Sequence, residues 1–199
     1  MKRVFSVGLL ILLFVLVSPV YGAAKPDQFV KETAETVLEK LKTEGDVIKN
    51  DPDRVNDIVT DMVLPHFDFE RMSKWVLGKH WRRASDEQKV KFIKEFKVLL
   101  VRTYANSLSE YSDQEIHYFP FRGTGKEEEV TVKTEIDQPG GFPIPINYDL
   151  YRVNDAWKVV DVAIDGVSLV ANYRSSFSAQ IRKLGVDGLI AKLSEGNQR

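Results

Sequence analysis

Three histidines, His66, His80 and His117, offer the most versatile chemistry in this 199-residue chain, because imidazole can act as an acid, a base or a metal ligand near neutral pH. No two of them stand three or four residues apart, and the HExxH pattern of helical zinc sites is absent. A zinc site on one of them would need carboxylates from distant parts of the chain. We therefore expect surface or interface histidines and no metal site.

Two aspartates near the end of a predicted strand, Asp161 and Asp165, are the carboxylates that we consider for acid or base catalysis. An aspartate in an apolar pocket has a raised pKa and can transfer protons, as in enzymes of the ketosteroid-isomerase type. Strand alternation, however, turns Asp161 away from the face that carries Val160 and Val162. Asp165 precedes Gly166 and suits a turn or a helix cap. The enzyme stays an alternative, and we expect no catalytic residue.

Nucleophile chemistry has even less support in the sequence. The chain contains no cysteine, which excludes a thiol nucleophile, disulfide bonds and the acylated cysteine of a lipoprotein. The GxSxG pattern of serine hydrolases is also absent. A chain without disulfides has to be stabilised by its own hydrophobic core, for which this chain is long enough.

The N-terminal segment predicts a secretory signal peptide. Lys2 and Arg3 precede an apolar stretch, Val4–Val17, that is shorter than the roughly 20 residues of a membrane-spanning helix. Small residues follow, so we expect cleavage after Gly22 or Ala24.

The remaining chain, residues 25–199, is expected to be a single domain of a secreted, soluble protein. Without the signal peptide it carries 26 basic and 29 acidic residues, and the basic residues are dispersed. This distribution does not indicate nucleic-acid binding. A signal peptide with neither an anchor nor cysteine predicts the periplasm of a Gram-negative bacterium, and we expect a monomer there.

Hydrophobic periodicity predicts helices in the first half of the domain, strands after them, and helices again at the end. Spacings of three and four predict about six helices, near residues 26–41, 52–64, 68–77, 85–111, 168–183 and 187–194. Ser85 and Gln88 form a capping box at the start of the longest one. Strict alternation predicts four strands, at 116–119, 130–136, 144–152 and 157–164. Short connections favour an antiparallel meander, and this order is typical of an α+β fold. We expect a curved four-stranded sheet wrapped by helices, with a cone-like outline.

The apolar residues on the inward faces allow two interpretations. Periodicity alone favours a close-packed core, because binding pockets are few per protein. The alternative is an interior left partly hollow for an apolar ligand. Periodicity cannot separate the two, because both need the same residues. A module with a solid core that only binds other proteins therefore also stays open.

Several ordered sequence runs resemble the signature of the MlaC family, also called the toluene-tolerance family. They are FDFERMS at 67–73, VLGKHWR at 76–82, ASDEQ at 84–88, TYA at 103–105, GVSLV at 166–170, NYRS at 172–175 and GVDGLI at 185–190. The resemblance extends from about Phe29 to Leu193. It is more specific than any single motif because many runs occur in the same order.

The resemblance implies a periplasmic phospholipid carrier whose cargo is held by its acyl chains in an apolar cavity, with no cofactor. It also implies two partners, an outer-membrane lipoprotein complex and the inner-membrane MCE-domain protein of an ABC transporter, in a system that maintains outer-membrane asymmetry. Lipid-lining residues are expected on the inward face of the sheet and on the helices beside it. They are Val76, Leu77, Leu100, Tyr104, Val130, Val132, Ile146, Tyr148, Leu150, Val162, Ile164, Val167, Leu169 and Tyr173.

Overall fold

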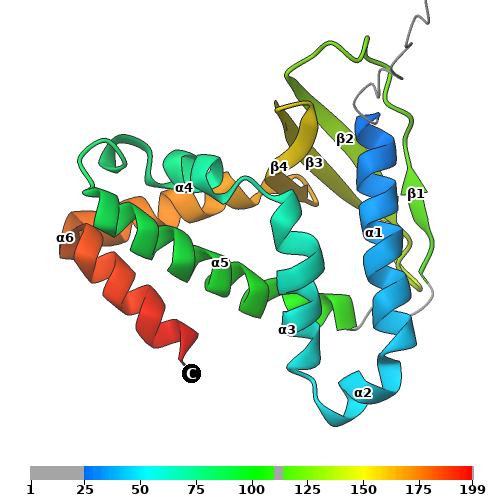
Figure 1. Ribbon diagram of the computed structural model, residues 1–199, viewed down its shortest axis with the longest axis horizontal. Coiled ribbons are helices and arrows are strands. Elements are labelled where there is room, and N and C mark those ends of the chain that lie inside the picture. Colours follow the sequence, from blue (N-terminus) through cyan, green and yellow to red (C-terminus); the bar gives the residue numbers. More distant parts are fainter. Residues whose placement is uncertain (1–24, 110–113, 199) are drawn as a thin grey trace, which may run out of the picture.

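A computed structural model of the protein describes residues 25–109 and 114–198 (Figure 1). The predicted signal peptide, residues 1–24, lies outside the described residues. No helix among the described residues is both long enough and apolar enough to cross a membrane.

The described chain begins with helices, the first of which runs alongside the sheet (Figure 1). They are α1 (Pro26–Thr43), α2 (Gly45–Asn50) and α3 (Arg54–Ile58), followed by a π-helical turn, η1 (Val59–Val63), and a 3-10 turn, η2 (Leu64–His66). Helix α1 starts at a proline, whose missing N–H costs nothing in the first turn. Its buried residues Val30, Val37 and Leu41 follow the helical period.

Two further helices, α4 (Phe69–Leu77) and α5 (Asp86–Ser109), are joined by a 3-10 turn, η3 (Gly78–His80). The Asp68 side chain caps α4 by accepting from the backbone N–H of Arg71 at 2.9 Å. The predicted capping box at the start of α5 is confirmed. The backbone N–H of Ser85 donates to Gln88 Oε1 at 3.0 Å, and the N–H of Gln88 donates to Ser85 Oγ at 3.1 Å.

The sheet is an antiparallel meander in the order β1-β2-β3-β4-β5. Its strands are β1 (Ile116–Tyr118), β2 (Glu129–Ile136), β3 (Ile144–Val153), β4 (Ala156–Ile164) and β5 (Val167–Ser168). The α+β class and the antiparallel pairing are confirmed, whereas the prediction of four strands is wrong. The fifth strand has two residues, too few to show an alternating pattern, and it pairs with the end of β4 across Asp165 and Gly166, both at positive φ.

A β-bulge in β4 changes which residues face the inside of the sheet. Leu150 pairs with Val159, whereas the preceding Asp149 pairs with Asp161, so Val160 is an extra residue between them. The alternation used to place Val160 on the same face as Val162 is therefore wrong. Val159 takes that position.

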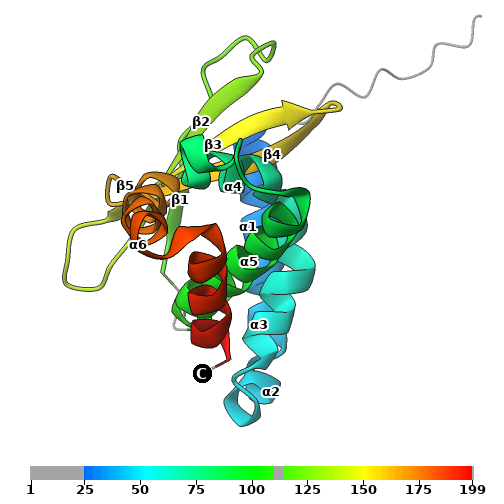
Figure 2. The same ribbon diagram turned by 90° about the vertical axis from the view of Figure 1, so that its left-hand side faces the viewer.

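The last helix, α6 (Leu169–Asn197), is broken at Gly185, whose φ of 73° and ψ of 178° are not helical. The predicted break at this glycine is confirmed. Helices α4, α5 and α6 gather on one side of the molecule, while α1 runs alongside the sheet (Figures 1 and 2). The fold therefore presents a group of helices next to a sheet, with the beginning of α6 directly joined to the last strand.

Three clusters of apolar side chains form the core. The first, called the helical cluster, joins α4, α5 and α6, and contains Phe92, Phe96, Tyr173 and Phe177 in ring contact. The second, the sheet cluster, joins Val30 of α1 to the inner face of β2, β3 and β4. The third packs α1 against α3 and the last turns of α5.

Candidate apolar ligand site

The predicted lining residues fall into the helical cluster and the sheet cluster. In the helical cluster, Val76, Leu77 and Leu100 are buried, and Tyr104 and Tyr173 are half-buried. In the sheet cluster, the buried members are Val130, Val132, Leu150 and Val162, and the half-buried members are Ile146, Tyr148, Ile164 and Leu169. Val167 is 57% exposed on β5 and belongs to neither cluster. The fold thus brings thirteen of the fourteen residues into two neighbouring clusters.

The inner face of the sheet is covered unevenly. At one end, Leu150, Trp157 and Val159 are each no more than 5% exposed. At the other end Ile146, Tyr148 and Ile164 keep part of their surface accessible. Ile146 pairs with Ile164 on the neighbouring strand, and Tyr148, two residues further along β3, pairs with Val162. These three side chains are therefore incompletely covered by the protein itself, although their neighbours Val132, Thr134 and Val162 are buried.

The first turns of α6 connect the two clusters. Leu169 packs against the sheet cluster, and Tyr173, four residues later, packs against the helical cluster. Residues four apart lie on the same side of a helix, one above the other. Phe67, before α4, also packs against both clusters. We call the half-buried members of the predicted lining in the two clusters the apolar strip: Tyr104, Ile146, Tyr148, Ile164, Leu169 and Tyr173.

Two tyrosines of the apolar strip, Tyr104 and Tyr148, are held in their neutral form. Burial, with a smaller effect of the neighbouring Tyr173, raises the pKa of Tyr104 to about 12. Burial also raises the pKa of Tyr148, against a smaller opposing effect of a hydrogen bond with Thr134. These hydroxyls therefore carry no charge near neutral pH, which keeps the strip compatible with an apolar ligand.

Of the two candidate acids, Asp161 has a structural role and Asp165 lies on the surface. Asp161 is 9% exposed, and one of its carboxylate oxygens accepts from the backbone N–H groups of Val162 at 2.8 Å and Val170 at 3.0 Å. The other oxygen accepts from the hydroxyl of Ser168, which itself caps α6 by accepting from the N–H of Ala171. Asp165 is exposed in the turn between β4 and β5. The arrangement ties the start of α6 to β4 and leaves neither carboxylate in an apolar pocket.

Replacing Asp161 by alanine is expected to lower the free energy of unfolding by about 2 to 4 kcal/mol, because two buried backbone donors and the hydroxyl of the helix-capping Ser168 lose their acceptor. Urea denaturation followed by circular dichroism measures the change. The control is Asp165→Asn, because asparagine tolerates the positive φ of this exposed position. Equal stability of the wild type and Asp161→Ala would contradict the structural role.

Part of the sheet cluster was not predicted from the sequence. The bulge at Val160 concealed the inward position of Val159 and Trp157. Phe67 and Phe121 also pack there, but they come from connecting segments without a regular period. No sequence pattern marks such residues. Val30, in contrast, lies on the predicted stripe of α1 and needed only the knowledge that this stripe meets the sheet.

The predicted internal cavity is not shown by the part of the chain that the structure describes. Two surface depressions are present there. One, of about 460 Å³, lies between the segment after β1 and the middle of β2, and the other, of about 570 Å³, lies beside Glu115 and Asp137. Neither contains a residue of the apolar strip.

Fold and site define an α+β protein in which an apolar sheet face with a few partly accessible side chains meets a group of helices. The family model described as MlaC protein matches residues 31–195. The chain therefore belongs to the MlaC family.

Individual proteins support the same assignment. The chain is 27% identical to the intermembrane phospholipid transport system binding protein MlaC of Haemophilus influenzae, over 98% of this chain and 93% of that protein. It is 28% identical to the toluene tolerance protein ttg2D of Pseudomonas putida, over 96% of this chain and 92% of that protein. A solved structure, the phospholipid-binding protein of Ralstonia solanacearum in complex with a phospholipid, matches with a TM-score of 0.81 and 31% identity, over 88% of this chain and 98% of that chain.

Proposed function

We propose that this protein binds a phospholipid and carries it between membranes. The observation that supports this most is the apolar strip, whose members belong to two neighbouring clusters and are incompletely covered by the protein's own side chains. The neutral side chains of Tyr104 and Tyr148 add polar groups to the strip without adding charge. The relatives named for phospholipid transport and phospholipid binding span nearly the whole chain, which supports the same proposal.

Acyl chains are the part of the cargo that this site suits. Each methylene group removed from water contributes roughly 0.8 kcal/mol, so two long chains do not cross an aqueous space unaided at a useful rate. A site made of aliphatic and aromatic side chains shields these tails and leaves the head group near solvent. In this proposal the clusters separate along the strip to form the lipid cavity, and all fourteen predicted lining residues are candidates for its wall.

The proposed place of action is the periplasm, which the predicted signal peptide also indicates. There the protein would exchange lipid with an outer-membrane lipoprotein complex and with the MCE-domain protein of an inner-membrane ABC transporter. Docking has to trigger release, because a carrier that shields both tails releases them slowly by itself. The protein is not proposed to be an enzyme, since its two candidate acids serve the fold or face solvent.

Lipid transfer between vesicles tests the proposal directly. Donor vesicles contain a self-quenched fluorescent phospholipid, acceptor vesicles contain none, and transfer raises the fluorescence. We expect the protein to load with lipid from donors and to increase the initial rate in proportion to its concentration. A rate independent of protein concentration, together with no labelled lipid on the re-isolated protein, would contradict the proposal.

A further inference from the structure

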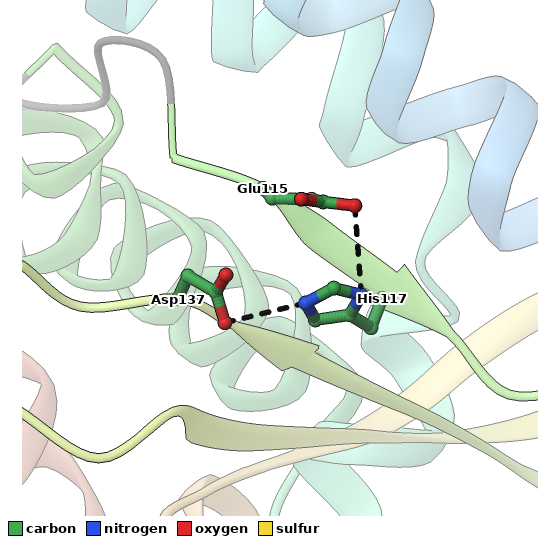
Figure 3. A group of neighbouring side chains, drawn as sticks. All are labelled: Glu115, His117 and Asp137. Carbon is green, nitrogen blue, oxygen red and sulfur yellow. Dashed lines mark hydrogen bonds and ion pairs between the residues drawn. The ribbon is translucent and has the colours of Figure 1, made fainter.

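One histidine lies between two carboxylates at the edge of the sheet (Figure 3). His117 Nε2 is 3.3 Å from Asp137 Oδ1, and His117 Nδ1 is 3.8 Å from Glu115 Oε1. Each of the three residues offers a ligand atom, and these atoms lie within 4.8 Å of one another. Asp137 is 20 residues from His117, so strand pairing supplies the distant carboxylate that a zinc site on a single histidine needs.

The backbone fixes the relative positions of these three residues. Ile116 pairs with Ile136, and the N–H of Asp137 donates to the carbonyl of Glu115 at 3.0 Å, which extends the ladder beyond the strand ends. Glu115 and His117 are two residues apart and therefore point to the same side of the sheet. Side chains placed by a ladder are positioned more precisely than side chains on loops.

The cluster lies on the side of the sheet opposite to the apolar strip. In β2 the buried residues are Val130, Val132 and Thr134, so the alternation places Lys133, Glu135 and Asp137 on the wet side. Glu135 pairs with His117 in register and adds a third carboxylate to this surface. Lys133, two residues before Glu135 on β2, contributes one positive charge against these three carboxylates. The local charge around the imidazole is therefore mainly negative and favours a cation.

We propose that Glu115, His117 and Asp137 form a binding site for a divalent transition-metal ion of the Zn²⁺ class. One imidazole nitrogen and two carboxylate oxygens are ligands that Zn²⁺ accepts at roughly 2.0 to 2.2 Å, which places neighbouring ligand atoms about 3.4 Å apart. The two carboxylates stand beside different ring nitrogens, and one ion binds only one of these, so the proposal requires the Glu115 side chain, which is 73% exposed, to rotate toward the ion. Glu115 and Asp137 also line a surface depression of about 570 Å³, which leaves room for water as the remaining ligands. A bound ion would fasten the edge strand β1 to β2.

Calorimetric titration with ZnCl₂ tests the site. The protein is purified without a histidine tag, treated with a chelator and exchanged into a buffer that does not bind zinc. We expect one saturable binding event per chain. His117→Ala, Glu115→Gln and Asp137→Asn should each weaken binding at least ten-fold. The matched control is His80→Gln, which also removes one histidine and leaves the cluster unchanged.

Bound Co²⁺ gives a second readout, because ligation by the protein produces visible absorption bands that the hydrated ion lacks. We expect these bands in the wild type and in His80→Gln, and their loss in His117→Ala, with circular dichroism showing that this variant is folded. Zinc should also raise the melting temperature of the wild type and leave that of His117→Ala unchanged. Failure of the wild type to bind Zn²⁺ saturably, or equal binding by the His117→Ala variant, would overturn the proposal and leave the cluster as a surface ion pair.

Discussion

Replacing Ile146 by arginine is expected to remove bound phospholipid while leaving the protein folded. Ile146 is a half-buried member of the apolar strip, opposite Thr134 on β2 and Ile164 on β4. An arginine there places a guanidinium among apolar side chains, where an unpaired charge costs several kcal/mol when lipid tails exclude water. Without lipid, the long side chain can reach solvent through the incompletely covered end of the face. We expect at least a ten-fold lower lipid content per protein.

The matched control for this prediction is the neighbouring residue. Asn147→Arg introduces the same side chain one position along β3, where the alternation turns it to the opposite side of the sheet. We expect lipid content and transfer rate close to those of the wild type. Phospholipid is measured in both variants by extraction and mass spectrometry, with circular dichroism to verify folding. Equal lipid loss in both variants, or none in Ile146→Arg, would show that the apolar strip does not hold the cargo.

Replacing Phe96 by alanine is expected to cause the largest loss of stability. Phe96 is completely buried, and its ring lies 5.6 Å from that of Phe92, 5.4 Å from Tyr173 and 6.1 Å from Phe177. The substitution removes these contacts and leaves a cavity between α5 and α6. Comparable changes cost about 3 to 5 kcal/mol. For a domain of this size, that corresponds to a melting temperature lower by roughly 6 to 20 °C.

Phe142 provides the control for this substitution. It is 92% exposed in the segment between β2 and β3, so Phe142→Ala should change the free energy of unfolding by less than about 0.5 kcal/mol. Urea denaturation of both variants measures the difference. If Phe96→Ala unfolds at the same urea concentration as Phe142→Ala, the aromatic contacts in the helical cluster are not a main source of stability.

The regular elements of this fold could be predicted from the sequence because each carries a local signal. The capping box at Ser85, the break at Gly185 and the alternation along β3 each depend on residues that are close together in the chain. Strand β5 could not be predicted, because two residues carry no periodic signal. The bulge at Val160 also escaped prediction, since an extra residue leaves the strand apolar and only changes its phase.

The candidate site was predictable only in part, for the same physical reason. Periodicity identified which side chains turn inward, and thirteen of the fourteen chosen residues lie in the two clusters beside each other. It could not show that Val76 and Leu77 are completely buried whereas Ile146 and Tyr148 are not, because coverage depends on helices far away in the chain. Contacts between distant segments also explain why Asp137 was not associated with His117.

Phospholipid that co-purifies with the wild-type protein provides the most direct test of the central claim. The protein is purified gently and without detergent after secretion in a Gram-negative host, extracted with organic solvent, and the extract is analysed by mass spectrometry with an internal standard. The account predicts phospholipid in a defined ratio to protein, near one molecule per chain. Repeated preparations of folded protein without phospholipid, which also fail to take it up from vesicles, would contradict it.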